Sequence, residues 1–233
     1  MPPEMSQLMD PKLVVLTAPR SVAAEQYRAL RTNLEFMSVS GALDRVMVTS
    51  GTPGTGKSLT ASNLAIALAQ AGKNTLLVDA DLRRPMVHHL FGNANLSGLT
   101  TALTRPDEWE KYVQRGPVGG LSVLTSGPIP PNPSELLSSP IMMDLLGQFS
   151  RNYDIVIIDT SPVVSFTDAV ALSQGVDGVI LVVRARHTSR KADLKGKERL
   201  AQVHARLLGV VLNDIAMQDE AYSYYYGYGE KKL

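Results

Sequence analysis

The stretch that most constrains the fold lies between residues 46 and 58, where a short apolar run is followed by Gly-x-x-x-x-Gly-Lys-Ser. The run Val46–Thr49 is typical of a buried strand, and Leu59–Ala71 is typical of a helix. Glycines at such a junction let backbone N–H groups turn toward an anion, and the helix N-terminus adds a favourable dipole. This order predicts a phosphate loop that binds a nucleoside triphosphate through Gly51, Thr52, Pro53, Gly54, Thr55, Gly56, Lys57 and Ser58.

Two side chains of this loop have roles that follow from their positions. Lys57 is expected to reach the outer phosphates, and the hydroxyl of Ser58 is expected to bind Mg²⁺. The alternative is a Gly-rich turn without a ligand. The complete eight-residue pattern between a strand and a helix disfavours that alternative.

Apolar segments alternate with helical segments along most of the chain. The segments 75–79, 153–159 and 178–184 show no polar alternation, which is typical of strands buried on both faces. We therefore predict an α/β fold of the P-loop NTPase type, with a doubly wound, mostly parallel sheet and helices on both faces. The expected strands are 46–49, 75–79, 121–124, 153–159, 178–184 and 210–213. The expected helices are 22–37, 59–71, one capped by Ser134, one that starts at Thr167, and 191–208.

The length of 233 residues suits one α/β domain, which we place at residues 1–216. Within it we expect an N-terminal arm over residues 1–20, followed by a helix over about residues 22–37. Beyond this domain, residues 217–233 are expected to form a flexible tail.

Composition excludes several classes of function. The chain has no cysteine, which rules out disulfides and thiolate sites, and its formal net charge of +1 gives no bulk attraction to nucleic acid or anionic lipid. No apolar run approaches a membrane span, and the Met-Pro-Pro-Glu start lacks the pattern of a signal peptide. We therefore expect a cytoplasmic protein that does not bind nucleic acid and that needs a separate tether to work at a membrane.

Three aspartates end predicted strands: Asp79 and Asp81 close the second, and Asp159 closes the fourth. Ligands of open α/β sheets bind at the carboxyl ends of strands, and side chains two apart on an extended chain point the same way. We predict these three residues, with Lys57, as the catalytic set. Asp79 would orient the attacking oxygen and accept its proton, while Asp81, Asp159 and Ser58 would hold Mg²⁺. The division between Asp79 and Asp81 stays open, and a solvated strand-end turn is the alternative for each aspartate.

The C-terminal segment holds five of the eight tyrosines, interleaved with glycine and serine, and no helix or strand period would bury such a cluster. Attached to a nucleotide-binding domain, a row of phenols is a set of candidate phosphate acceptors. A phenol with a pKa of about 10 needs a nearby base, which a strand-end aspartate would provide. A sticky terminus without enzymatic role is the alternative. The candidate acceptors are Tyr222, Tyr224, Tyr225, Tyr226 and Tyr228.

Taken together, these segments resemble the cytoplasmic kinase domain of bacterial tyrosine kinases that regulate capsule and exopolysaccharide synthesis. The resemblance implies autophosphorylation of the tail in trans, with ATP and Mg²⁺, within rings of subunits. It also implies a membrane-embedded activator of the polysaccharide co-polymerase type, a tyrosine phosphatase as partner, and a location at the inner face of the plasma membrane. The segments that carry it span nearly the whole chain: Gly51–Ser58, Leu76–Arg84, Gly127–Leu137, Val156–Pro162 and the terminal tyrosines.

Two further sets of residues gain a role from the resemblance. Glu25, Arg28 and Arg31 match the family's Glu-x-x-Arg-x-x-Arg subunit-contact motif, and such a spacing falls on one edge of a helix. A solvated face with an intrahelical ion pair is the alternative. Asn213 is similar to the family's adenine-side residue, with a capping or turn role as the alternative.

A different class of protein shares part of this pattern, namely the dimerising ATPase switches that position septa or partition plasmids. Those proteins place a second lysine after the first glycine of the loop, where this chain has Thr52, and they lack a terminal row of tyrosines. A third interpretation, a non-catalytic module that recruits partners through its tail, conflicts with the intact Lys57, Asp79, Asp81 and Asp159. The sequence therefore favours a protein-tyrosine autokinase.

Overall fold

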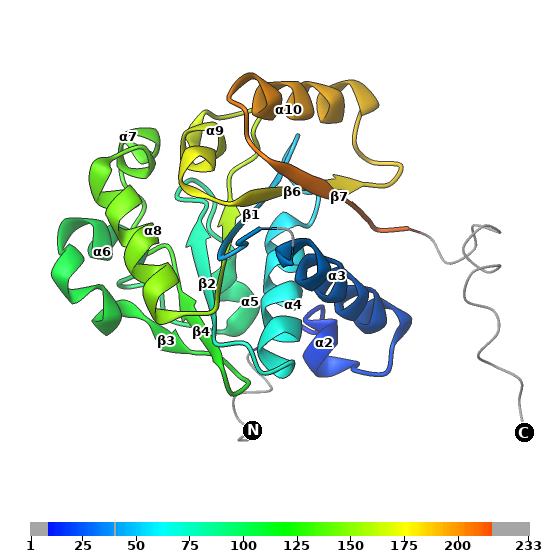
Figure 1. Cartoon of the computed structure of the whole chain (residues 1–233), viewed down its shortest axis with the longest axis horizontal. Coiled ribbons are helices and arrows are strands. Elements are labelled where there is room, and N and C mark those ends of the chain that lie inside the picture. Colours follow the sequence, from blue (N-terminus) through cyan, green and yellow to red (C-terminus); the bar gives the residue numbers. More distant parts are fainter. Residues whose placement is uncertain (1–8, 40, 216–233) are drawn as a thin grey trace, which may run out of the picture.

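The computed structural model describes residues 9–39 and 41–215, so the five predicted acceptor tyrosines lie outside the described residues. The strands are β1 (Arg45–Ser50), β2 (Thr75–Ala80), β3 (Gln114–Arg115), β4 (Leu121–Leu124), β5 (Ile155–Thr160), β6 (Gly178–Arg184) and β7 (Leu207–Asn213). They form one seven-stranded sheet with the order β3-β4-β2-β5-β1-β6-β7 (Figure 1). All neighbouring strands run parallel except β3 and β4.

Helices cover both faces of this sheet (Figure 1). One face packs against α2 (Val14–Thr17), α3 (Val22–Ser38), α4 (Lys57–Gln70) and α5 (Val87–Phe91). The other packs against α6 (Leu99–Thr104), α7 (Pro133–Leu137), α8 (Pro140–Asn152), α9 (Asp168–Leu172) and α10 (Arg190–Gln202). The doubly wound, mostly parallel α/β fold predicted from the sequence is thus confirmed. No helix in the part of the chain that the structure describes is long and apolar enough to cross a bilayer.

The central strands are apolar along their length because both of their faces are covered. Every residue of β2 and β5 is buried. In β5, Ile157 packs into the core under α4, whereas Val156 and Ile158 pack into the core on the opposite face, with Phe149 of α8. Two cores therefore take alternate side chains of the same strand, which explains the continuous apolar run.

The strand order brings the carboxyl ends of β2, β5 and β1 side by side. Asp79 of β2 pairs in register with Asp159 of β5, and Asp159 pairs with Val48 of β1. The phosphate loop leaves β1 two residues after Val48, at Ser50. Residues from three distant parts of the sequence therefore meet at one edge of the sheet, as expected for a ligand site of an open α/β fold.

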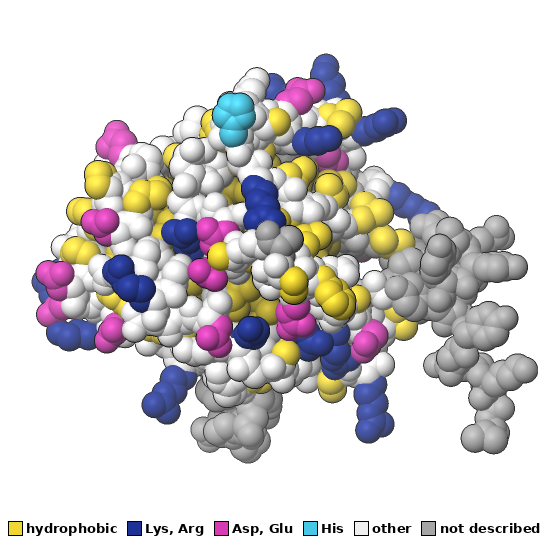
Figure 2. Space-filling model, viewed as in Figure 1, with side chains coloured by type: hydrophobic (Ala, Val, Ile, Leu, Met, Phe, Trp, Pro, Cys, Tyr) yellow, Lys and Arg dark blue, Asp and Glu magenta, His cyan; other side chains and the backbone are white. Residues whose placement is uncertain are grey.

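The surface of the face shown in Figure 2 carries acidic and basic side chains that are interspersed with apolar ones. This distribution is consistent with the formal net charge of +1. The electrostatic field over this face therefore has no single sign.

Several expected boundaries are wrong. Ser134 lies inside α7 rather than capping it, and the N-cap of the following helix α8 is Ser139, whose side chain accepts a hydrogen bond from the Met142 backbone N–H. The last helix ends at Gln202 instead of residue 208, because the chain turns at His204 with a positive φ and then enters β7. The segment between residues 82 and 120, which showed little periodicity, contains α5, α6, a 3-10 helix (Pro106–Tyr112) and β3.

The N-terminal segment also differs from the expected arm over residues 1–20. Residues Val14–Thr17 form the short helix α2, and the side chains of Leu13 and Val15 are fully buried in the core under α4. The backbone N–H of Val15 donates a hydrogen bond to the Asn63 side chain of α4. This part of the segment is therefore a packed element of the domain.

Replacing Leu13 with alanine tests this packing. We expect Leu13→Ala to lower the free energy of unfolding by about 2–5 kcal/mol, because it leaves a cavity in the core. The matched variant Leu96→Ala, at a side chain that is 88% exposed, is expected to change it by less than about 0.5 kcal/mol. Urea unfolding followed by circular dichroism measures both, and equal values for the two variants would show that residue 13 lies in a mobile arm.

Candidate active site

The phosphate loop joins β1 to α4, and two of its glycines have backbone conformations that disfavour other residues. Gly54 and Gly56 have φ values of 77° and 88°. Gly56 is the N-cap of α4, so no side chain covers the free N–H groups of the first turn. A Cβ at Gly56 would lie 2.2 Å from Nδ2 of Asn213. The loop is therefore shaped so that backbone donors point at a ligand, as phosphate binding requires.

Lys57, the first residue of α4, lies among oxygen atoms of the predicted catalytic residues. Its Nζ is 2.7 Å from Oδ2 of Asp81, 3.4 Å from Oδ1 of Asp159 and 3.2 Å from Oγ of Ser58. All four residues are buried. The structure thus brings together the lysine, the serine and two of the three aspartates that the sequence predicted.

The electrostatics of this cluster are unbalanced because three carboxyl groups surround one ammonium. Burial and the charge of Asp159 raise the pKa of Asp79 to about 8. Burial likewise raises the pKa of Asp159, although Lys57 opposes the shift. Burial acts to lower the pKa of Lys57, but Asp159 and Asp81 hold it above its usual value. The cluster therefore favours the binding of a further cation.

The donors present suit Mg²⁺. The hydroxyl of Ser58 and the carboxylates of Asp81 and Asp159 are hard oxygen ligands, and the ammonium of Lys57 already lies among them. No group of three or more His, Cys, Asp or Glu residues with metal-binding geometry exists among the described residues. Protein-bound Mg²⁺ commonly uses one or two carboxylates together with substrate phosphates and water.

Asp79 differs from the other two aspartates. Its Oδ2 accepts hydrogen bonds from the backbone N–H groups of Met86 and Val87 at 3.1 and 3.0 Å, and its Oδ1 accepts one from Asp81 at 3.2 Å. Its side chain is fully buried. The strand alternation that would direct Asp79 and Asp81 the same way does not extend to Asp81, because β2 ends at Ala80. In this structure Asp79 holds the connection from β2 to α5.

A cavity of about 530 Å³ opens in front of the loop, within the roughly 300–1,000 Å³ typical of small-molecule sites. Lys57, Ser58 and Asp81 line it, whereas Asp79 is not among the described residues that do. Its remaining lining residues are Asp10, Lys12, Pro53, Gly54, Gly56, Leu59, Arg84, Met86, Leu90, Pro162, Ser165 and Phe166.

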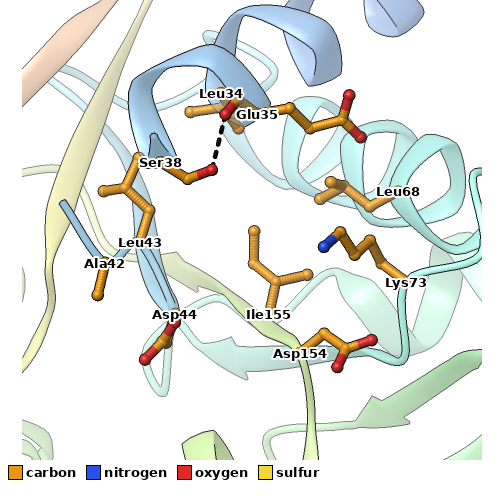
Figure 3. Close-up of a pocket in the computed structure, with 10 residues that line it drawn as sticks. All are labelled: Leu34, Glu35, Ser38, Ala42, Leu43, Asp44, Leu68, Lys73, Asp154 and Ile155. Atoms are coloured by element: carbon orange, nitrogen blue, oxygen red, sulfur yellow. Dashed lines mark hydrogen bonds between the residues drawn. The ribbon is translucent and has the colours of Figure 1, made fainter. Parts of the chain in front are cut away.

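Figure 3 shows a different hollow, of about 470 Å³, at the other edge of the sheet. Asp44 and Asp154 line it directly before β1 and β5, and Lys73 lines it two residues before β2. These positions are the amino ends of the same central strands. The hollow in Figure 3 is therefore separate from the phosphate loop, which follows the carboxyl end of β1.

Asn213, the last residue of β7, contacts the phosphate loop. Its Nδ2 donates a hydrogen bond of 2.9 Å to the Thr55 carbonyl, and Arg184 donates one of 3.3 Å to the Gly54 carbonyl. Asn213 lines a neighbouring hollow of about 450 Å³, together with Tyr27 of α3. The structure thus places Asn213 beside the loop, while its contact with a nucleotide base stays a prediction.

The predicted subunit-contact residues lie on α3, outside the cavity lining. Arg28 Nη1 pairs with Glu25 Oε2 at 2.6 Å, and Nη2 donates to the Pro19 carbonyl at 2.7 Å. Arg31 pairs with Glu35 at 3.6 Å. The intrahelical pair that we considered as the alternative is therefore present, and the role of the motif between subunits stays a prediction.

Sequence analysis missed a contact between the connections that follow β2 and β5. Arg83 binds Asp168 through both a 2.6 Å and a 3.0 Å hydrogen bond, and its guanidinium carbon lies 4.2 Å from the centre of the Phe166 ring. Asp168 also accepts hydrogen bonds from Ser161, at 3.1 Å, and from Ser134. The partners lie up to 85 residues apart, and only the position of Asp168 at a helix start was visible in the sequence.

The Asp168 contact predicts a pH dependence of stability. Burial acts to raise the pKa of Asp168, but hydrogen bonds from Arg83, Ser134 and Ser161 hold it below its usual value. A carboxyl with a lowered pKa stabilises the fold above its unfolded-state pKa of about 3.9, and that stability is lost at lower pH. We expect Asp168→Asn to lower the free energy of unfolding at pH 7 by on the order of 2 kcal/mol, and the difference from wild type to shrink below about pH 4.

Urea unfolding at pH 7, 4 and 3 measures this difference. Asp144→Asn, at an exposed position of α8, is the matched control and is expected to have little effect at any of these pH values. A difference between Asp168→Asn and wild type that stays constant down to pH 3 would contradict the assignment of the ion pair.

Comparison with known proteins agrees with this geometry. The sequence profile of the ParA family, described as NUBPL iron-transfer P-loop NTPase, matches residues 42–227. The chain is 45% identical to the tyrosine-protein kinase YwqD of Bacillus subtilis (strain 168), over 94% of this chain and 92% of that protein. It is 39% identical to the tyrosine-protein kinase etk of Escherichia coli (strain K12), over 88% of this chain but 28% of that longer protein.

Solved structures show the same relationship. The crystal structure of the chimerical protein CapA2B2 superposes with a TM-score of 0.84 and 40% identity, over 90% of this chain and 96% of that one. The kinase domain of the Escherichia coli tyrosine kinase ETK superposes with a TM-score of 0.83 and 37% identity, over 87% of this chain and 80% of that one. The septum site-determining protein MinD of Pyrococcus horikoshii, at 20% identity and a TM-score of 0.63, shares the fold alone. The chain therefore belongs to the bacterial tyrosine-protein kinases among the ParA-type P-loop NTPases, and it is a protein-tyrosine kinase.

Proposed function

We propose that this kinase is an autokinase that transfers the γ-phosphoryl group of Mg-ATP to the tyrosines of a neighbouring copy's tail. The observation that carries the proposal is the buried cluster of Lys57, Asp81 and Asp159 beside the phosphate loop, at an open cavity. The five tyrosines between residues 222 and 228 supply candidate acceptors on the same chain.

In this mechanism the phosphate loop binds the triphosphate through its backbone N–H groups. Lys57 would contact the outer phosphates, and Ser58 and Asp159 would hold Mg²⁺, which would supply positive charge to the phosphate oxygens. Asp81, a candidate metal ligand, also lines the cavity, whereas Asp79 is not among the described residues that do. We therefore assign to Asp81 the role first considered for Asp79, which is to orient the phenol and accept its proton.

The transfer step balances without a further reactant. The phenol oxygen forms a bond to the γ-phosphorus while the bond between that phosphorus and the β,γ-bridging oxygen breaks. ADP leaves with the bonding electron pair, and the phenol proton passes to Asp81. Lys57 stabilises the negative charge that develops on the phosphates. Asn213, which contacts Thr55, would border the adenine base.

The cellular setting follows from the family resemblance. We propose that the kinase forms rings of subunits through Glu25, Arg28 and Arg31, and that it acts in capsule or exopolysaccharide synthesis. A membrane-embedded co-polymerase would activate it at the inner face of the plasma membrane, and a tyrosine phosphatase would reverse its reaction. The relative etk is a longer protein, of which this chain spans 28%.

Incubation with Mg-ATP followed by mass spectrometry tests the reaction. We expect phosphate on tyrosines between residues 222 and 228, and a loss of its rate of at least about 100-fold in Lys57→Met, because the lysine stabilises the transferred charge. Release of free phosphate with an unmodified tail would instead indicate a nucleotide-switched ATPase and would contradict the proposal. The tail-truncated chain, lacking residues 222–233, is expected to bind nucleotide with nearly unchanged affinity.

Replacing Arg28 and Arg31 together with alanine tests the oligomer. We expect the variant to sediment as a monomer where wild type forms a larger assembly, and to phosphorylate the tail in trans more slowly. The control replaces Arg190 and Lys191, two exposed basic residues of α10, and is expected to sediment like wild type. Sedimentation velocity measures both, and an unchanged profile for the α3 variant would refute the interface.

A further inference from the structure

Met86 and Phe166 are apolar side chains that line the cavity from the connections that follow β2 and β5. Met86 lies in the connection that follows β2, after Asp81, and Phe166 lies in the connection that follows β5, after Asp159. The Met86 side chain is 45% exposed, and Phe166 is partly exposed. Phosphate groups and Mg²⁺ are bound by polar and charged groups. Binding of phosphates at the loop therefore does not explain why these two apolar residues line the cavity.

The Phe166 ring is fixed in place. The guanidinium of Arg83 lies over the ring at 4.2 Å, and the same guanidinium is held by Asp168 through two hydrogen bonds. Asp168 is fully buried and also accepts a hydrogen bond from Ser161 in the Phe166 loop. An aromatic ring that packs on an arginine held by two hydrogen bonds presents a rigid surface to the cavity.

Arg83 also helps to position Asp81, the residue that we propose accepts the phenol proton. The backbone N–H groups of Arg83 and Arg84 donate hydrogen bonds of 3.3 and 3.0 Å to Oδ1 of Asp81. The other oxygen of Asp81 faces Lys57 at 2.7 Å. Through its backbone and its side chain, Arg83 therefore contacts both Asp81 and Phe166, two residues that line the same cavity.

We propose that Phe166 and Met86 form the wall of a subsite for the phenol ring of the acceptor tyrosine, with the phenol hydroxyl directed at Asp81. This inference rests on the proposed autokinase function. A phenol ring gains contacts with an aromatic face and with a methionine sulfur, and it leaves its hydroxyl free for the carboxylate. Serine and threonine lack a ring to bury on this wall, so the subsite would favour tyrosine as acceptor.

An aromatic wall is also suited to a nucleotide base, but the geometry points elsewhere for the base. Asn213, the residue that we place beside adenine, contacts Thr55 and lines the hollow between α3 and β7. It is not among the described residues that line the cavity with Phe166 and Met86. The residue that we place beside the base and the residues of the proposed phenol wall therefore line different hollows next to the same loop.

A trans-phosphorylation assay separates the two substrates. The donor is the full chain with its five tail tyrosines replaced by phenylalanine, and the acceptor is a Lys57→Met copy with an intact tail. In the donor, we expect Phe166→Ala to raise the KM for the acceptor by about fivefold or more, while the KM for Mg-ATP changes less than about twofold. Met86→Ala, at a more exposed side chain, is expected to act in the same direction.

Two control variants of the donor test whether the loss of the ring at residue 166 causes the change in KM. Phe166→Tyr keeps the ring and is expected to restore most of the acceptor affinity lost in Phe166→Ala. Leu96→Ala, outside the cavity, is expected to leave both KM values unchanged. Thermal unfolding of each donor shows whether it is folded. If the Phe166→Ala donor is unfolded, the KM values of the Met86→Ala donor decide the result.

Unchanged acceptor KM values in the folded variants would overturn the subsite, and so would a rise in the KM for Mg-ATP equal to that for the acceptor. The second outcome would mean that the wall contacts the nucleotide. If the donor with wild-type Phe166 and Met86 fails to label the acceptor tail at all, the autokinase function fails and the subsite with it. Labelling with unchanged KM values refutes the subsite alone.

Discussion

The site depends on one buried ammonium group that lies among buried carboxyl groups. Lys57 is within 3.4 Å of both Asp81 and Asp159. Both carboxylates are buried, so solvent screens their charges little. Asp79 adds a third acid whose pKa is raised to about 8 by burial and by Asp159. Such a concentration of like charge is costly in a protein interior. A further cation bound in the site would lower this cost.

The parallel sheet makes this concentration possible. Because β2, β5 and β1 are neighbouring parallel strands, their carboxyl ends lie at one edge of the sheet, and α4 starts after the loop that follows β1. The connections after these strands are then fixed to each other by Arg83 and Asp168, and the loop is fixed from β7 by Asn213. The chemistry is carried by short loops, but their positions are set by strands that are buried on both faces.

The central strands were predictable from the sequence, whereas the start of β7 and the packing of the N-terminal segment were not. The runs that became β2, β5 and β6 are long enough and apolar enough to indicate buried strands without further information. Residues 207 and 208 were assigned to a helix, because their pattern does not distinguish the end of a helix from the start of β7. Leu13 and Val15 were placed in an arm, because burial of a four-residue helix depends on the groove that α4 offers it.

By itself, the sequence determined the phosphate loop, the acids at strand ends and the kinase family, because these depend on residue type at fixed local spacing. Only the tertiary structure decided which acid faces the cavity. Asp79 and Asp81 look equivalent in the sequence, yet backbone N–H groups of residues 81, 86 and 87 bind the first, whereas the second lines the cavity. The stacking of Arg83 on Phe166 was likewise invisible, because it joins residues 83 apart that only the sheet brings into contact.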